Sequence, residues 1–248
     1  MQLLRRVPGA LFVMAVPLFL ICASVAWAVN DPGVYWRGFQ KHQVSLYTGI
    51  ADDDLKRVGA DIRRYFNSAQ EPLTVRTRIF GQEQELFKER EVLHMRDVKR
   101  LFWGVYVMGS LCGIYLGAVT ILGLRRQGRG FLPRLAGLTL MGGILTLGLA
   151  MVVGAFSLTG FSSLFLLFHQ ISFGNDLWQL DPATDYLLAL FPLGFWFDVT
   201  MLVAALTVTG ALALSAASGA WLYLHRQQGE QQDHPEPPAN SSSDTQLT

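Results

Sequence analysis

Residues 101–160 read LFWGVYVMGSLCGIYLGAVTILGLRRQGRGFLPRLAGLTLMGGILTLGLAMVVGAFSLTG. Two charge-free stretches, 101–124 and 135–160, flank a short loop, 125–134, in which four residues are arginine. A membrane-spanning helix needs about 20 predominantly apolar residues, so each stretch predicts one span. Because arginines in short loops stay on the cytoplasmic side of a membrane, the connecting loop is expected in the cytoplasm.

Two further apolar stretches lie towards the ends of the chain. Residues 1–29 hold a charge-free run from Val7 to Val29, and residues 199–224 hold another. Of the 248 residues, 51% are hydrophobic and only 16% are charged, whereas a soluble domain carries roughly 25% charged residues. The sequence therefore predicts an all-α integral membrane protein with four transmembrane helices and both termini in the cytoplasm.

The first span has an alternative interpretation as a secretory signal peptide. Arg5 and Arg6 precede the apolar run, and Ala26-Trp27-Ala28 resembles a cleavage site. The run is longer than the roughly 7 to 15 residues of a signal-peptide core, so we expect a retained helix. Cys22 does not mark a lipoprotein signal, because Ile21 before it is larger than the small residue that such a site requires.

Residues 30–100 are expected outside the cytoplasm, since long loops cross the membrane largely regardless of their charge. Three aspartates open a predicted helix at 51–66, and Glu71-Pro72 indicates a turn. Residues 73–80 favour a strand, and a charged helix is expected to run from Gln82 into the second span. The loop can thus fold as a small extracytoplasmic cap.

Residues 161–198 contain no Lys or Arg and are expected at the outer membrane surface. After a breaking point at 159–163, we expect a short surface element from Leu164 to Phe173. A second surface or re-entrant piece precedes the last span, where Pro192 disfavours a regular helix. The polar residues 225–248 predict a disordered cytoplasmic tail.

Composition and missing motifs exclude several classes of function. A net charge of +1 without a basic segment gives no nucleic-acid signature. Cys22 and Cys112 lie in apolar runs, which argues against a disulfide framework or a thiolate metal site. The sequence has no glycine-rich phosphate loop, no G-x-S-x-G nucleophile elbow and no paired-histidine zinc helix. We therefore expect no cofactor or metal, and a self-contained downhill reaction such as an acyl transfer.

Two histidines are expected at the same outer membrane level. His94 lies shortly before the second span, and His169 follows the third. On a helix, Glu91 and His94 share a face and Asp97 lies on the next turn, where a carboxylate would raise the imidazole pKa and support a general base. The alternatives are a solvated charged helix for His94 and an interfacial histidine for His169. Asp198 is a further candidate, because an ionisable group at a membrane edge needs a partner or water.

Three segments together resemble the bacterial lipoprotein intramolecular transacylase family. They are Phe87-x3-Glu91-x2-His94-Met95-x-Asp97-Val98, FHQISFGNDLWQLDP around His169, and LLALFPLGFWFD before the last span. The resemblance implies a four-span protein of the bacterial cytoplasmic membrane. It also implies transfer of an acyl chain from the glyceryl group of a diacylated lipoprotein to the α-amino group of its N-terminal cysteine. The family's two outward histidines would correspond to His94 and His169.

The expected roles follow from this reaction. We assign the base to His94, supported by Glu91 or Asp97, and the proton or oxyanion donor to His169, with Asp198 in support. The segments that carry Phe168, Trp178, Phe191 and Trp196 would accept acyl chains at the bilayer edge. The alternatives are a membrane subunit whose outer loops dock a partner, and a bis-histidine haem or quinone protein.

Overall fold

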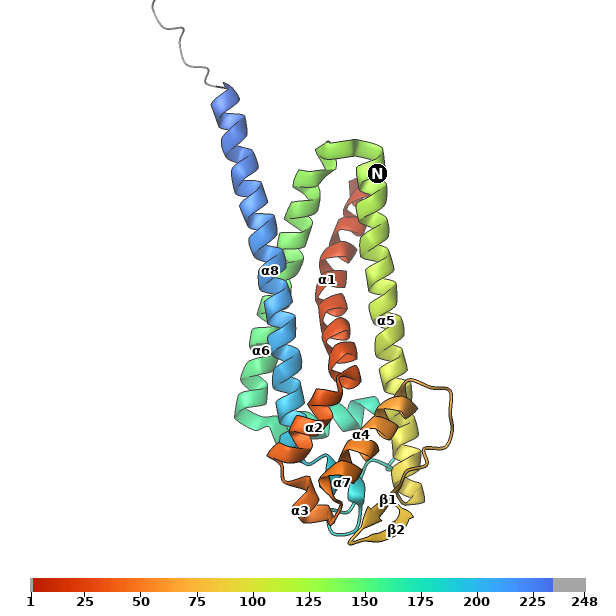
Figure 1. Ribbon diagram of the computed structural model, residues 1–248. Helices are drawn as coiled ribbons and strands as arrows, with labels where there is room; N and C mark the ends of the chain where they lie inside the picture. Colours follow the sequence, from red (N-terminus) through yellow and green to blue (C-terminus); the bar gives the residue numbers. More distant parts are fainter. Residues whose placement is uncertain (1, 234–248) are drawn as a thin grey trace, which may run out of the picture.

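Four long helices form most of the structure, a computed structural model that describes residues 2–233. They are α1 (Gln2–Asn30), α5 (Glu89–Gln127), α6 (Leu132–Ser172) and α8 (Leu193–Asp233). The 3-10 turn η1 (Gly128–Phe131) reverses the chain between α5 and α6 (Figure 1). By length and composition, three stretches of the described residues can cross a membrane: Val7–Asn30, Glu89–Ser172 and Leu193–Gln227. The middle stretch contains both α5 and α6.

Small residues allow the long helices to approach closely. Gly142 of α6 faces Val16 of α1, and a Cβ atom added at Gly143 would lie 3.1 Å from the carbonyl oxygen of Ala211 on α8. Such small residues are typical of helix contacts in membranes, where packing rather than water exclusion drives association. Helix α1 contacts α5, α6 and α8.

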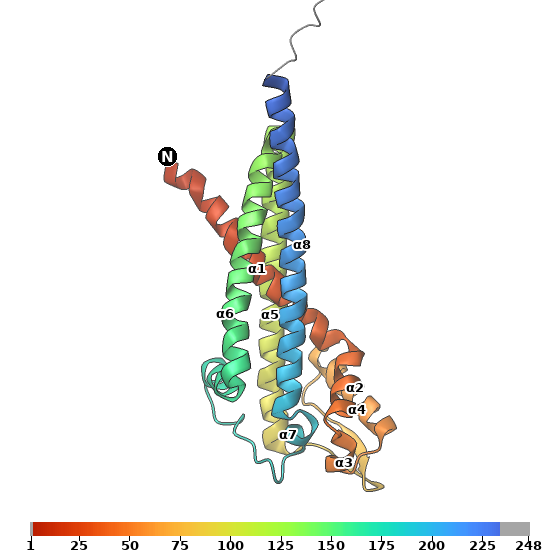
Figure 2. The ribbon, with the colours of Figure 1, turned by 90° about the vertical axis from the view of Figure 1, so that its left-hand side faces the viewer.

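A layer of short elements, which we call the cap, covers one end of the bundle (Figures 1 and 2). It contains α2 (Pro32–Lys41), α3 (Val44–Thr48), α4 (Asp52–Phe66), β1 (Arg76–Ile79), β2 (Gln82–Glu85) and α7 (Tyr186–Leu190). The two strands form an antiparallel hairpin. The core of the cap is made of buried apolar side chains, among them Phe39, Ile50, Leu55, Ile62 and Leu190. The predicted helix at 51–66 corresponds to α4, and the predicted strand at 73–80 contains β1.

The prediction of a helix from Gln82 is wrong. Residues 82–85 form β2, because Phe80 (φ 48°) and Gly81 (φ 81°) adopt left-handed conformations that reverse the chain after β1. Helix α5 begins only at Glu89. There the backbone N–H of Lys88 donates to the Glu91 carboxylate at 2.8 Å, as in a capping box.

The outer part of α6 turns away from the bundle at Gly160, whose φ of −163° and ψ of 51° are non-helical. Residues 161–172 then run across the bundle instead of along it (Figures 1 and 2). The break lies where the sequence predicted it. The expected disordered tail is partly wrong, because α8 continues through residues 225–233. The remainder of that tail, 234–248, lies outside the described residues.

Candidate active site

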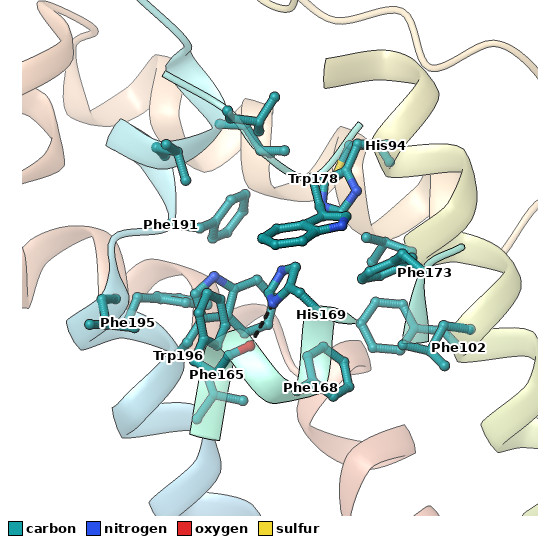
Figure 3. Close-up of a pocket in the computed structure, with 18 of the residues that line it drawn as sticks. His94, Phe102, Phe165, Phe168, His169, Phe173, Trp178, Phe191, Phe195 and Trp196 are labelled. Atoms are coloured by element: carbon teal, nitrogen blue, oxygen red, sulfur yellow. Dashed lines mark hydrogen bonds between the residues drawn. The ribbon is translucent and has the colours of Figure 1, made fainter. Parts of the chain in front are cut away.

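Both histidines face one cavity of about 740 Å³ where the bundle meets the cap (Figure 3). Its walls come from α1, α2, α4, α5, α6, α7 and α8, and from residues 173–185, which we call the covering segment. Six residues singled out in the sequence line this cavity: His94, Phe168, His169, Trp178, Phe191 and Trp196. Glu91, Asp97 and Asp198 do not line it.

The two imidazole rings lie close together although they come from different helices. His94 is in the second turn of α5 and is 6% exposed. His169 is on the part of α6 that runs across the bundle. Their ring centroids are 6.1 Å apart with an interplanar angle of 31°. One small reacting group can therefore contact both rings.

The hydrogen bonding of His169 fixes its tautomer. Its Nδ1 is 2.8 Å from the carbonyl oxygen of Phe165, one helical turn earlier. A carbonyl oxygen can only accept, so Nδ1 carries the proton and Nε2 of the neutral ring carries the lone pair. The rings of Phe165 and Trp178 lie 4.4 Å and 5.3 Å from the imidazole centroid and hold it in place.

The environment keeps both imidazoles neutral at pH 7. Burial, and then the nearby His169, lower the pKa of His94 to about 4, although Asp97 opposes the change. Burial also lowers the pKa of His169, against the effect of its hydrogen bond to Phe165. The expected rise in the pKa of His94 is therefore wrong, because burial outweighs the carboxylate. Nδ1 of His94 is buried and has no hydrogen-bond partner within residues 2–233.

The two carboxylates near His94 bind other groups. Glu91 is fully buried and accepts hydrogen bonds from the backbone N–H groups of Lys88 and Leu187, at 2.8 Å and 2.7 Å. Burial raises the pKa of Glu91 despite these bonds. Asp97 accepts from the side-chain amide of Asn175 at 2.9 Å and pairs with an arginine on its own helix. Both carboxylates thus tie the covering segment and α7 to α5.

Asp198 lies in a different contact. Its carboxylate is 2.6 Å from Nζ of Lys41 and 2.9 Å from Nε2 of His42. Both partners belong to the C-terminal end of α2, so this group connects the cap to the start of α8. The sequence correctly indicated that Asp198 needs a polar partner, but that partner is outside the cavity.

Several lining residues were not singled out in the sequence. They are mainly aromatic: Phe66, Phe102, Phe165, Phe173 and Phe195. Phe165 precedes His169 by one helical turn, a spacing that could have identified it. Phe102 and Phe195 carried no such signal, because their position depends on how α5 and α8 pack. Within the described residues, no cluster of three or more His, Cys, Asp or Glu side chains could hold a metal ion.

One family model matches most of the chain. The model of the family described as lipoprotein intramolecular transacylase Lit matches residues 10–196. A protein of Aquifex aeolicus (strain VF5), described as uncharacterized, is 33% identical over 125 residues, which are 49% of this chain and 51% of that protein. That match spans about half the length of the relative.

Solved structures with a similar fold come from the membrane integral lipoprotein intramolecular transacylase Lit of Bacillus cereus. One in meso structure has a TM-score of 0.73 at 14% identity and covers 92% of this chain and 100% of that chain. A variant with one histidine replaced by arginine has a TM-score of 0.69 at 16% identity, over 90% and 94% of the two chains. The shared fold and the apolar helices identify a multi-pass membrane protein.

Proposed function

Because the chain belongs to the lipoprotein intramolecular transacylase family, we propose that it moves an acyl chain from the glyceryl group of a diacylated lipoprotein to the α-amino group of its N-terminal cysteine. The product is a lyso-form lipoprotein with an amide-linked chain. The observation that carries the proposal is the pair of neutral imidazoles, 6.1 Å apart, in a cavity lined mostly by apolar and aromatic side chains. Its volume of about 740 Å³ suits a ligand pocket, for which roughly 300 to 1,000 Å³ is typical.

The proposed topology has four spans in the bacterial cytoplasmic membrane, formed by α1, residues 101–124 of α5, residues 135–160 of α6 and residues 199–224 of α8. The N-terminus, η1 and the C-terminal end of α8 all lie at the bundle end opposite the cap (Figure 1). Arg125, Arg126 and Arg129 lie beside or within η1. Basic residues in short loops favour the cytoplasmic side, so both termini are cytoplasmic and the cavity opens on the extracytoplasmic side.

The proposed reaction depends strongly on positioning. The attacking amine and the ester belong to one substrate molecule, and holding two such groups together can reach effective concentrations of about 10⁵ to 10⁸ M. The amine nitrogen attacks the ester carbonyl carbon, the bond from that carbon to the glyceryl oxygen breaks, and one proton moves from nitrogen to this oxygen. An ester becomes an amide, so no nucleotide is needed to drive the transfer.

We assign the proton transfer to His169 and the oxyanion contact to His94. Nε2 of His169 has a free lone pair, since Nδ1–H donates to Phe165. It can take the proton from the attacking nitrogen and deliver it to the glyceryl oxygen. His94, whose Nδ1 has no hydrogen-bond partner among the described residues, donates a ring N–H to the tetrahedral oxyanion. These roles reverse the assignment made from the sequence.

The aromatic walls suit the acyl chains. Phe168 and Trp178 lie against His169, with ring centroids 5.3 Å away in each case. Phe191 and Trp196 also line the cavity, and their ring centroids are 6.1 Å apart. We propose that these four residues bind the glyceryl ester and the first part of its chain, because apolar surface released from water stabilises the bound state.

Alanine variants test the proposal. His94→Ala and His169→Ala should each insert into the membrane and lower formation of lyso lipoprotein by about 10²- to 10⁴-fold, the usual contribution of a proton-transfer group. The double variant should be little worse than the worse single variant, because the two rings act on one reacting centre. His225→Ala is the matched control, since His225 lies at the far end of α8 and does not line the cavity.

Mass spectrometry of lipoprotein N-termini, from cells with and without each variant, gives the readout. Normal acyl transfer by the double variant would refute the catalytic assignment. The outer loops would then be better interpreted as a surface that docks a partner.

A further inference from the structure

The cavity contains no charged side chain among the residues that the structure describes. Its polar lining consists of Tyr35, His94, Ser162, His169, Gln170 and Gln179, and every other lining residue is apolar or aromatic. Because burial lowers the pKa values of both histidines, they add no charge at pH 7. A ligand that enters this cavity therefore meets no formal charge.

Cations on α5 near His94, and Lys88 just before this helix, interact with groups outside the cavity. Nζ of Lys88 is 2.8 Å from the Asp185 carboxylate, and Arg90 donates to the backbone carbonyl of Asp176. Nζ of Lys99 is 3.1 Å from the Glu71 carboxylate. Arg100 pairs with Asp97 at 3.3 Å.

Arg96 is two residues from His94 and therefore points to a different face of the helix. It does not line the cavity. An anion inside the cavity would thus meet no cation among the residues that line it.

This arrangement matters because the surrounding bilayer contains lipids that closely resemble the proposed substrate. A glycerophospholipid and a diacylated lipoprotein both carry two fatty acyl esters on glycerol. They differ at the third carbon, which bears an anionic phosphate in the first and an uncharged thioether in the second. Taking a phosphate out of water without a cation is costly, whereas a thioether loses little hydration.

We propose that the cavity selects uncharged glyceryl headgroups and excludes glycerophospholipids by offering their phosphate no partner. The inference rests on the proposed function and names the feature of the substrate that the site accepts. The selectivity comes from the free-energy cost of burying the phosphate of a glycerophospholipid, and not from an additional contact with the diacylated lipoprotein. Free diacylglycerol, which lacks the phosphate, is then a ligand of this cavity.

Competition between matched lipids tests the inference. Purified protein in detergent micelles would act on a synthetic diacylated lipopeptide, with dioleoylglycerol or dioleoyl phosphatidic acid added at the same mole fractions. Their acyl chains are identical, so only the headgroup differs. We expect dioleoylglycerol to inhibit at a mole fraction at least about 10-fold lower, since an unpaired buried charge costs more than the energy of one tenfold step. Equal inhibition by the two lipids would overturn the inference.

Two neighbouring serines provide a matched pair of variants. On residues 161–172, Ser162, Phe165 and His169 follow helical spacing and line the cavity, whereas Ser163 does not line it. Ser162→Lys adds a cation to the wall and should make phosphatidic acid at least about 10-fold more inhibitory. Ser163→Lys adds the same charge outside and should leave the preference for dioleoylglycerol unchanged. Equal responses of the two variants would contradict the inference.

A binding measurement separates this inference from the proposed function. Trp178 and Trp196 line the cavity, so brominated diacylglycerol should quench their fluorescence more strongly than brominated phosphatidic acid. The variants Trp178→Phe and Trp196→Phe show how much of the quenched fluorescence comes from each of these two tryptophans. If the lipopeptide is not converted but this preference is found, the proposed function fails and the selectivity stands. If conversion occurs without any headgroup preference, the selectivity alone fails.

Discussion

The coupling between the two imidazoles can be measured directly by replacing His169 with glutamine. Their centroids are 6.1 Å apart, and two unit charges at that distance repel by about 0.7 kcal/mol in water and about 2.7 kcal/mol at an effective dielectric constant of 20. Removing the charge of His169 should therefore raise the pKa of His94 by roughly 0.5 to 2 from its value of about 4. Since burial is the larger cause, the pKa of His94 should stay below 6.5.

Nuclear magnetic resonance of the protein with isotope-labelled histidine, titrated in detergent micelles, would measure this pKa. The chain contains 5 histidines, and the signal of His94 is the one that disappears in His94→Gln. His225→Gln is the control and should leave the titration of His94 unchanged. A pKa of 6.5 or higher in the unmodified protein would show that the ring is not buried as the structure places it. An unchanged pKa in His169→Gln would show that the two rings do not face each other.

Three further results are expected. A reporter domain fused after Arg129 should be cytoplasmic and one inserted at Gly81 external, and the opposite pattern would overturn the topology. Gly38→Ala should lower the free energy of unfolding by about 1 to 3 kcal/mol, measured by denaturation in detergent, because the new methyl group overlaps a phenylalanine ring of the cavity wall. Gly104→Ala, which has no other atom within 4 Å of its new Cβ, is the control and should cost nothing. Asp198→Asn should lower the free energy of unfolding by at most about 1 kcal/mol and keep full activity, since the ion pairs of Asp198 are partly exposed. A loss of acyl transfer in a stable variant would show that this carboxylate takes part in the reaction.

The long helices and the break in α6 could be predicted because they depend on local composition. Charge-free runs and the arginine loop indicate spans whatever the tertiary structure is. Gly160, within the predicted breaking point at 159–163, has a non-helical conformation. His94 and His169 were found through their motifs and their common level at the membrane edge, and both line the cavity.

The β-hairpin could not be predicted because its second strand has no pattern of its own. Residues 82–85 read QEQE and are all exposed, so they lack the alternation that indicates a strand. They form one only because the left-handed turn at Phe80 and Gly81 places them beside β1. The end of α8 was missed for a related reason. Glutamine and glutamate favour helices, but their polarity led us to expect disorder after Arg226.

The carboxylates near His94 show the limit of spacing as a guide to chemistry. Helical spacing correctly places Glu91 and Asp97 near this ring, yet it cannot say which groups they bind. The Glu91 carboxylate accepts hydrogen bonds from the backbone N–H groups of Lys88 and Leu187. The Asp97 carboxylate accepts one from the side-chain amide of Asn175. His94 therefore lacks the carboxylate contact that would raise its pKa, and burial lowers the pKa instead.

A neutral pair of imidazoles suits the proposed chemistry better than the raised pKa that helical spacing led us to expect for His94. The ester, the deprotonated amine that attacks it and the amide product are all uncharged, so once the α-ammonium group has lost its proton, charge develops only while the tetrahedral intermediate exists. Before that moment, a permanent cation in the cavity would attract the phosphate of the surrounding lipids. The lone pair on Nε2 of His169 takes up the proton when the amine attacks and releases it when the glyceryl oxygen leaves. The same burial that lowers both histidine pKa values therefore leaves the two rings uncharged at pH 7 and the cavity suited to an uncharged glyceryl ester.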